Sequence, residues 1–360
     1  MLSRHQSFTK ARLLVALAAA LALIVVSLLR EEPSAPTAAE QWPQIKGYAE
    51  MVIPADNPMT AAKVELGKQL YYDSRLSGDG SRACYSCHLK ENGLTDGKPK
   101  AVGAYNAALP RSSPTLWNIG YHSEFYWDGR SKSLEAQAMA AWTGGNMGVS
   151  GKDGRPSTAD ICARLDQIEA YGKQFQAVFG SGCTPENVVK AVSAFERTIV
   201  STEKNSAWIR FREGDKKALS AAAQRGYELF RTKAGCTNCH DGLLLTDQQF
   251  HNVGIAWDAT KKDFSDLGRF KVSNQERDKG AFKTPTLLDI AKSAPYFHDG
   301  SVATLEEAVD FMLGGGRPNP QLDSANLVPR QLTSAERADL LEFLRALSVS
   351  YTVKDPKLPK

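Results

Sequence analysis

The run Cys84-Tyr85-Ser86-Cys87-His88 determines how the rest of this 360-residue chain must fold. Two thiols two residues apart, followed directly by a histidine, form the attachment signature of a c-type haem. Each thiol can add to a vinyl group of the haem, and the histidine then lies under the iron. C-x-x-C also serves zinc and redox sites, but a complete second copy, Cys236-Thr237-Asn238-Cys239-His240, argues against both. The sequence predicts two covalent haems, attached at Cys84, Cys87, Cys236 and Cys239, with His88 and His240 as proximal iron ligands.

The two motifs occupy corresponding places in an internal repeat. Each follows a segment of helical composition that ends in Gly-x-x-Leu-aromatic, at residues 62–71 and 221–230. Behind the motifs, residues 114–119 parallel 285–290 and residues 125–129 parallel 296–300, all at one constant offset. We call residues 62–141 the first repeat and residues 221–312 the second repeat.

Strand patterns are sparse, and apolar residues recur at helical spacing at 159–200, with a break at 180–182, and at 334–348. We therefore predict a mainly α fold with two cytochrome c-like haem domains related by internal duplication. The N-terminal haem domain is placed at residues 41–205. The C-terminal haem domain is placed at residues 206–360.

The N-terminus carries a predicted export segment within residues 1–40. Residues 13–29 are apolar except for Ser27 and follow three basic residues, an order that keeps the positive end in the cytoplasm. The segment is either a cleaved signal or an uncleaved inner-membrane anchor. We favour the anchor because no small-x-small cleavage site follows it. A Pro/Ala/Ser-rich tether comes next, and in both cases the haem domains are expected in the periplasm, touching the membrane only through this segment.

Charge and cysteine usage limit the partners and the compartment. Lysine and arginine number 44 against 40 acidic residues, a net charge of +4 that is too small to indicate nucleic-acid binding. Cys162 and Cys183 lie outside the haem motifs. In an oxidising compartment we expect these two to form a disulfide, with two unpaired buried thiols as the alternative.

The residue on the second face of each iron decides its chemistry. A methionine thioether raises the reduction potential and gives an electron-transfer haem, whereas an open face lets the iron bind a small oxidant. Met312 lies on the predicted distal helix of the second repeat, and the constant offset places Ala141 at the equivalent position of the first. Alanine cannot bind iron, so we predict a closed second haem and an open first haem. Met139 and Met147 lie near Ala141 but out of register.

An open haem that reduces peroxide needs a group that moves a proton between the two oxygens. Gln137 lies one turn before Ala141 and could donate a hydrogen bond. Asn146 lies where an acid would be useful, but an amide carries no such proton. Glu135 and Asp128 are the nearest carboxylates in sequence, and no residue stands out as the acid.

Together these motifs resemble those of the bacterial di-haem cytochrome c peroxidase and MauG family. The resemblance covers about residues 50 to 350. It implies two cytochrome c-like domains with a tryptophan and a calcium ion between the haems. It also implies reduction of hydrogen peroxide at the N-terminal haem, with electrons relayed through the C-terminal haem from a small redox protein, a cytochrome c or a cupredoxin. A homodimer also fits the resemblance. Besides the paired haem motifs, the segments that carry it are Phe125-Tyr126-Trp127-Asp128-Gly129-Arg130, Ala194-Phe195-Glu196-Arg197-Thr198, Pro285-Thr286-Leu287 and Ala294-Pro295-Tyr296-Phe297-His298-Asp299-Gly300.

Carried over to this chain, the resemblance assigns roles to five residues. Trp127 matches the bridging tryptophan. Asn118 matches the side-chain calcium ligand, and the backbone carbonyls of Lys283 and Pro285, with waters, complete the implied oxygen site. Met312 falls where the peroxidases have an axial methionine and MauG has a tyrosine.

Two departures from the family pattern widen the functional hypotheses. The peroxidases carry a histidine shortly before Pro114 that caps the first haem in the resting oxidised state, and residues 101–113 contain none. We therefore expect the first haem to be open without prior reduction of the second. Typical members also have a distal glutamate where this chain has Asn146. That leaves room for a MauG-like oxidase that uses peroxide to oxidise Trp or Tyr of a partner protein. A plain electron-transfer cytochrome is the third alternative, against which Ala141 argues.

Overall fold

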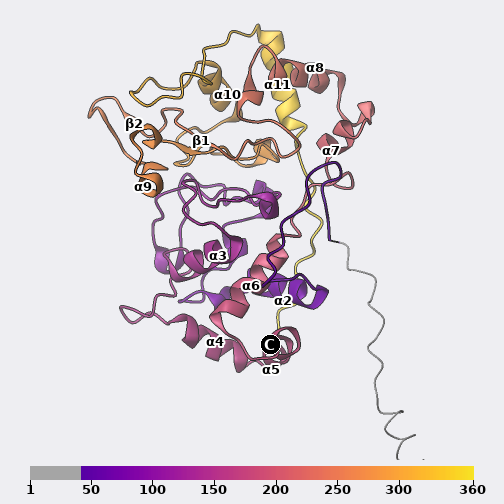
Figure 1. The fold of residues 1–360 in the computed structure, drawn as a ribbon, viewed down its shortest axis with the longest axis vertical. Coiled ribbons are helices and arrows are strands. Elements are labelled where there is room, and N and C mark those ends of the chain that lie inside the picture. Colours follow the sequence, from indigo (N-terminus) through magenta and orange to yellow (C-terminus); the bar gives the residue numbers. More distant parts are fainter. Residues whose placement is uncertain (1–41) are drawn as a thin grey trace, which may run out of the picture. The chain divides into compact units, whose positions relative to one another are not determined.

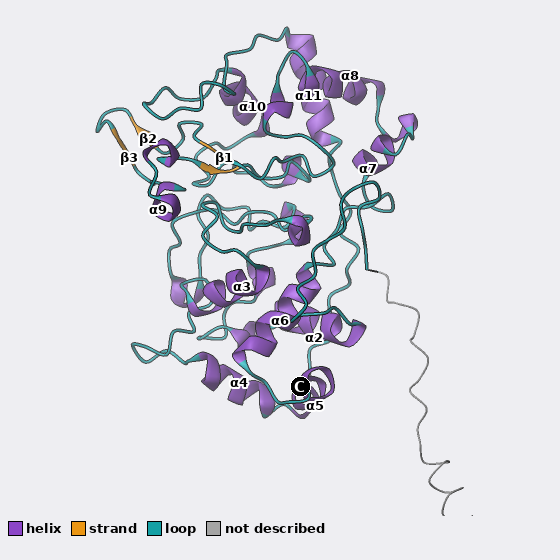
Figure 2. Ribbon diagram, in the orientation of Figure 1, coloured by secondary structure: helices purple, strands orange, loops and turns teal. Residues whose placement is uncertain are grey.

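A computed structural model describes residues 42–360, which form one compact unit (Figure 1). Helices are the main regular structure in this part of the chain, long loops connect them, and the strands make two sheets of two strands each (Figure 2). The predicted mainly helical class is confirmed. The predicted export segment at 13–29 lies outside the described residues. Within 42–360, no helix is both long enough and apolar enough to span a membrane.

The first repeat begins on one helix and ends on another. The helix before the motif is capped by Thr60, whose side chain accepts a hydrogen bond from Lys63 N, and the distal helix is capped in the same way by Ser133. The predicted helical stretch at 159–200 is broken at 180–182 as expected, and also at Gln167 and Ile168. The elements are α2 (Ala61–Tyr72), η2 (Cys84–Ser86), α3 (Leu134–Thr143), α4 (Thr158–Asp166), α5 (Glu169–Phe179) and α6 (Pro185–Glu196).

The second half of the chain has the same order around its motif and adds the short strands. The helix predicted at 334–348 is α11. The helical elements are α7 (Ala207–Arg212), α8 (Ala221–Arg231), η7 (Cys236–Asn238), α9 (Phe270–Ser273), α10 (Leu305–Leu313) and α11 (Ser334–Arg345). Strand β1 (Phe250–His251) pairs antiparallel with β4 (Phe282–Lys283), and β2 (Trp257–Asp258) pairs antiparallel with β3 (Asp263–Phe264).

In each half, two helices cross at a glycine. A Cβ atom on Gly67 of α2 would clash with the backbone of α6 and lie 3.1 Å from Cβ of Phe195. A Cβ atom on Gly226 of α8 would clash with the backbone of α11 and lie 2.9 Å from Cβ of Phe343. The close approach of the backbones requires glycine at both positions. The two crossings place Phe195 and Phe343 in equivalent surroundings.

Loop residues of the two repeats also share unusual backbone angles. Asn118 and Asp289 have φ of 58° and 56°, and Tyr126 and Phe297 both have φ of 68°. Such left-handed conformations are uncommon for residues other than glycine. The long loops of the two repeats therefore follow the same local path, although their sequences differ.

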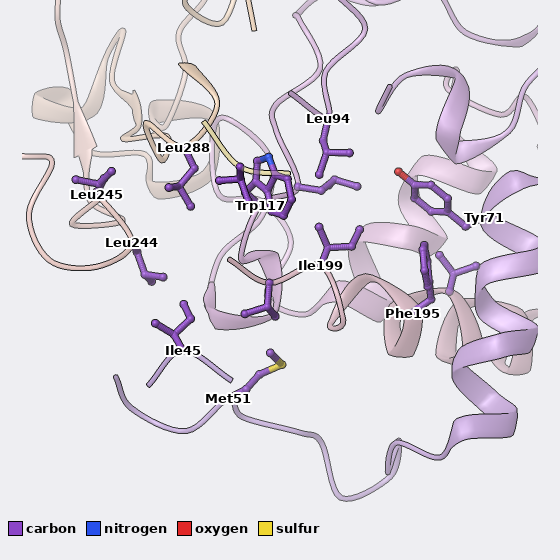
Figure 3. Packing of buried hydrophobic residues seen from close by; sticks show 14 of the residues in the cluster. Ile45, Met51, Tyr71, Leu94, Trp117, Phe195, Ile199, Leu244, Leu245 and Leu288 are labelled. Atoms are coloured by element: carbon purple, nitrogen blue, oxygen red, sulfur yellow. The ribbon is translucent and has the colours of Figure 1, made fainter. Parts of the chain in front are cut away.

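One hydrophobic core includes residues of both repeats. Figure 3 shows Trp117 between Leu94 of the first repeat and Leu288 of the second. The indole nitrogen of Trp117 donates a hydrogen bond of 2.8 Å to Asp289 Oδ2, which satisfies the one polar atom of this buried side chain. The two repeats are packed against each other through a shared apolar interior.

The C-terminal tail, residues 349–360, returns from the second half to the first repeat. The hydroxyl groups of Tyr351 and Tyr72 lie 3.3 Å apart. Nη2 of Arg75 donates a hydrogen bond of 2.7 Å to the carbonyl of Pro359. The end of the chain is thus tied to the segment just before the first haem motif.

The disulfide predicted between Cys162 and Cys183 is wrong, because both residues are free thiols. Both are buried. A hydrogen bond that the Cys183 thiol donates to Cys162, together with burial, raises the pKa of Cys183. An apolar interior stabilises the neutral thiols, so the alternative of two unpaired buried thiols holds.

Candidate functional site

Each haem motif opens into a cavity. The first cavity has a volume of about 370 Å³ and the second about 220 Å³. The structure gathers most of the sequence-predicted site residues around them. Those at the first cavity are Cys84, Cys87, His88, Trp127, Gln137, Ala141 and Asn146, and those at the second are Cys236, Cys239, His240, Trp127 and Met312.

The two motif histidines are held in the same way. Nδ1 of His88 donates to the carbonyl of Leu94, and Nδ1 of His240 donates to the carbonyl of Leu245, both at 3.0 Å. Because each Nδ1 is committed, Nε2 is the nitrogen left to bind a metal. Burial lowers the pKa of both histidines and so favours the neutral imidazole, the form that binds iron.

The motif cysteines have surroundings that fit thioether formation better than metal binding. Burial raises the pKa of Cys84 and Cys87, and it raises the pKa of Cys236 to about 12. A structural zinc site needs four ligands, whereas each motif itself offers two thiols and one imidazole. Beside the second motif, Asp247 and His251 lie close enough to Cys239 for the three residues to hold a metal ion, so the zinc alternative is disfavoured at the first motif alone.

The first cavity combines apolar walls with basic side chains. Its walls include apolar side chains from α6 and from the long loop, and Arg111, Arg130 and Lys271 contribute positive charge. A haem combines an apolar ring with two carboxylates, which this mixture of apolar and basic residues can satisfy. Arg111 is itself fixed by ion pairs of 2.7 Å to both Asp128 and Asp266.

The residues at the predicted axial positions differ between the two cavities, as the constant offset between the repeats predicts. One further methionine, which the offset does not predict, lines the first cavity. Met312 lines the second cavity and Ala141 lines the first. Met147 also lines the first cavity, where it is buried and its backbone N donates to the carbonyl of Ala141 at 3.2 Å. Met139 lines neither cavity. A thioether out of register is therefore present at the first cavity, which the constant offset could not indicate.

Trp127 lines both cavities. Its indole nitrogen donates a hydrogen bond of 3.0 Å to the carbonyl of Ser112. Its own carbonyl accepts one of 2.8 Å from Lys283 N on β4. The side chain and the backbone of Trp127 are therefore both fixed, which suits a residue that has to keep a constant distance to two cofactors.

The three residues of the implied calcium site do not line one cavity. Lys283 and Pro285 line a small cavity of about 50 Å³ next to Trp127, and Asn118 does not line it. Oδ1 of Asn118 instead accepts a hydrogen bond of 2.8 Å from Ser201 N. The carbonyls of Lys283 and Pro285 are thus left without their predicted side-chain partner.

A buried amine further opposes a cation at this place. Nζ of Lys283 donates to the carbonyl of Glu124 at 2.7 Å and lies 2.9 Å from Nδ1 of His122. Burial lowers the pKa of this amine to about 7. Calcium prefers six to eight oxygen ligands, and this cavity is also lined by Glu124, Thr284 and Thr286, which carry oxygen groups. Calcium binding by Asn118, Lys283 and Pro285 therefore stays a prediction.

Neither polar side chain predicted at the first cavity carries an ionisable proton. The backbone carbonyl of Gln137 accepts a hydrogen bond of 3.2 Å from the Tyr126 hydroxyl, which fixes this part of α3. The backbone carbonyl of Asn146 accepts one of 3.0 Å from Ala104 N. Both residues line the cavity and can offer amide hydrogen bonds to a bound molecule.

The two carboxylates nearest in sequence are engaged in ion pairs. Asp128 lines the first cavity and binds Arg111 at 2.7 Å. Glu135 does not line the cavity and binds Arg197 at 2.7 Å. Burial alone would raise the pKa of Glu135, but the hydrogen bond from Arg197 leaves it lowered. The carboxyl of Glu135 is therefore held in the ionised form, and Asp128 is committed to its ion pair with Arg111.

Glu196, at the end of α6, is the ionisable group that sequence reasoning missed. It lines the first cavity with 5% of its surface exposed, and its Oε2 has no hydrogen-bond partner among the residues described. Burial raises its pKa to about 8. The signal was available in the sequence: Val188, Val189, Val192 and Glu196 share one helical face, so the acid interrupts an apolar stripe.

Comparisons with known proteins agree with this picture. Residues 61–217 match the family described as di-haem cytochrome c peroxidase. The cytochrome-c peroxidase IdrP1 of Denitromonas iodatirespirans is 37% identical over 93% of this chain and 95% of its own. The methylamine utilization protein MauG of Methylorubrum extorquens is 38% identical over 85% of this chain and 84% of its own.

A solved structure extends the similarity to the fold. The crystal structure of a MauG-like protein associated with microbial copper homeostasis has a TM-score of 0.77 and 35% identity to this chain. The similarity extends over 86% of this chain and 96% of that structure.

Proposed function

Because the chain belongs to the di-haem cytochrome c peroxidase and MauG family, we propose that it reduces hydrogen peroxide at the first cavity. The electrons reach that cavity from the second one. The observation that carries this proposal is that Trp127 lines both cavities, since one fixed aromatic side chain then connects the site of reduction with the site of electron entry. A small redox protein, a cytochrome c or a cupredoxin, is the electron donor.

Covalent haem c at each motif would supply the redox chemistry, and the residues of the chain divide the remaining tasks. His88 and His240 would each bind the iron of the haem in their own cavity, and Met312 would be a further iron ligand in the second cavity. Ala141 leaves space for peroxide in the first. Gln137 and Asn146 orient the bound oxidant through their amide groups.

Two further features of the proposal rest on the sequence pattern. We interpret the paired helix crossings and paired loop conformations as an internal duplication, with haem domains at 41–205 and 206–360. We place the protein in the periplasm because of its predicted export segment and its c-type attachment motifs. The export segment, the domain boundary and a homodimer are independent of the chemistry proposed here, and calcium at Asn118, Lys283 and Pro285 is not part of it.

The test of the relay is the replacement Trp127→Phe. The rate at which the protein oxidises reduced cytochrome c with peroxide should fall about tenfold or more, while the spectra of both haems stay unchanged. Trp257→Phe is the matched control, because Trp257 lies on β2 and lines neither cavity. Equal rates for the Trp127 variant and the control would refute the relay.

The open first site is tested by the electron paramagnetic resonance and absorption spectra of the oxidised protein. A high-spin signal from one haem is expected. Low-spin signals alone would refute the open site, and Met147→Leu then identifies whether this thioether is the sixth ligand.

A MauG-like oxidase is the second candidate, favoured by Asn146 at the first cavity in place of an acid. In that case peroxide oxidises a Trp or Tyr of a partner protein rather than a soluble donor. Peroxide and reduced cytochrome c added together decide between the two. Sustained oxidation of the cytochrome supports the peroxidase, and a long-lived oxidised state of the protein that ignores the cytochrome supports the oxidase.

A further inference from the structure

The two helix crossings provide an internal comparison between the cavities. Phe195 and Phe343 occupy equivalent places opposite the crossing glycines. The residue that follows each phenylalanine lines the cavity of its own half, and these residues are Glu196 at the first cavity and Leu344 at the second. An apolar side chain at this position is therefore compatible with the fold. The first cavity, where peroxide is expected, has a carboxyl group at this position, and the second cavity does not.

The structure gives Glu196 no evident structural partner. Its Oε2 is buried and accepts no hydrogen bond from any residue in the described part of the chain. A buried carboxyl without a partner reduces the stability of a fold. A group that destabilises the fold yet faces a reaction cavity is a functional candidate.

The charged and titratable groups around Glu196 come from each packed element. The thiol of Cys84 in η2 and the hydroxyl of Tyr71 in α2 lie near Glu196, and both are uncharged. Arg197, the next residue in sequence, and Glu135 of α3 also lie near this carboxyl and form an ion pair with each other. Burial is the main cause that raises the pKa of Glu196 to about 8, Arg197 opposes it, and Glu135 adds to it. At neutral pH the carboxyl is therefore protonated, and its ionisation lies close to the working pH, as an acid catalyst requires.

We propose that Glu196 holds the proton that the first cavity delivers during peroxide reduction. This inference rests on the proposed function. Reduction of one H2O2 to two waters consumes two electrons and two protons. The redox-protein donor supplies both electrons, the carboxyl of Glu196 supplies one proton, and solvent supplies the second. Glu196 regains that proton from solvent on the side of the partly exposed Glu135.

The experiment compares Glu196→Gln with Glu196→Asp in the haem-loaded full chain. kcat and KM for peroxide are measured between pH 5 and pH 9. We expect kcat/KM of the Gln variant at pH 7 to fall about 100-fold, the range of one general acid. The wild-type loss of activity near pH 8 should disappear in this variant. The Asp variant should keep a pH-dependent step. Glu91→Gln, beside the first motif but exposed and outside the cavity, is the matched control.

A second measurement does not depend on turnover. The infrared spectrum of the wild type at pH 7 should contain the carbonyl band of a protonated carboxylic acid, which titrates near pH 8 and is missing from Glu196→Gln. A variant with the wild-type rate and pH profile, or a wild type without this band, would overturn the proposal. A wild type that consumes no peroxide at any pH would overturn the proposed function as well, so the two failures are distinguishable.

Discussion

Replacing Glu196 by Gln should change how the stability of the protein depends on pH. A carboxyl whose pKa is about 8 in the folded chain, against an ordinary value of 4.5, binds its proton more tightly in the native state. Below pH 4.5 both states are protonated and the group has no effect. Between the two values the unfolded state releases the proton first, so the free energy of unfolding falls as the pH rises. Above pH 8 the free energy of unfolding stays lower by the full amount than it is below pH 4.5.

The size of the effect follows from the two pKa values. Their difference of roughly 3.5 corresponds to about 5 kcal/mol, and the steepest dependence is about 1.4 kcal/mol per pH unit. The Gln variant has a similar shape and no titration, so it should gain this free energy relative to the wild type between pH 5 and pH 8.

Urea unfolding followed by far-ultraviolet circular dichroism measures this difference at each pH, provided that both proteins unfold reversibly with equal denaturant slopes. Other titrating groups cancel in the comparison. Glu91→Gln, at an exposed glutamate, should give a curve parallel to that of the wild type. If the Glu196 variant also runs parallel to the wild type, the carboxyl is not buried in the protonated form and the reasoning fails.

Three further outcomes are expected. Met312→Ala should convert the second haem to a high-spin spectrum, and an unchanged spectrum would mean that another residue binds that iron. Gly67→Ala and Gly226→Ala should each lower the free energy of unfolding by about 1–3 kcal/mol, because the added methyl group meets the backbone of the crossing helix; thermal unfolding at or above the wild-type temperature would contradict this. Cys162 and Cys183 should not react with a thiol reagent in the folded protein, and both should react once the protein is unfolded in the absence of a reductant. A failure to react after unfolding would indicate a disulfide.

The sequence was most informative where function depends on local spacing. After each C-x-x-C-H motif, the histidine binds the carbonyl of the leucine in the Leu-Thr-Asp segment that follows, six residues on in the first repeat and five residues on in the second. The constant offset places Ala141 and Met312 at their respective cavities. Spacing is preserved by a repeated fold even where most residues differ, so these positions could be located without coordinates.

The remaining site residues depend on contacts between distant segments. Met147 lines the first cavity because the chain turns back after α3. The constant offset between the repeats carries no information about this turn. Glu196 belongs to a helix that follows the first repeat and is not compared with α11 until the helix crossings are known. Asn118 looks available as a ligand in the sequence, but its amide is bound by Ser201, 83 residues further along the chain.

The return of the C-terminal tail has a consequence for the order in which the protein is made. Tyr351 meets Tyr72 across 279 positions of sequence, and Asp355 pairs with Lys90 just behind the first haem motif. Chains are synthesised from the N-terminus at about 5–20 residues per second. The first motif is therefore complete well before the tail exists to cover its neighbours. The contacts of residues 349–360 with the first repeat are therefore among the last that the chain can form.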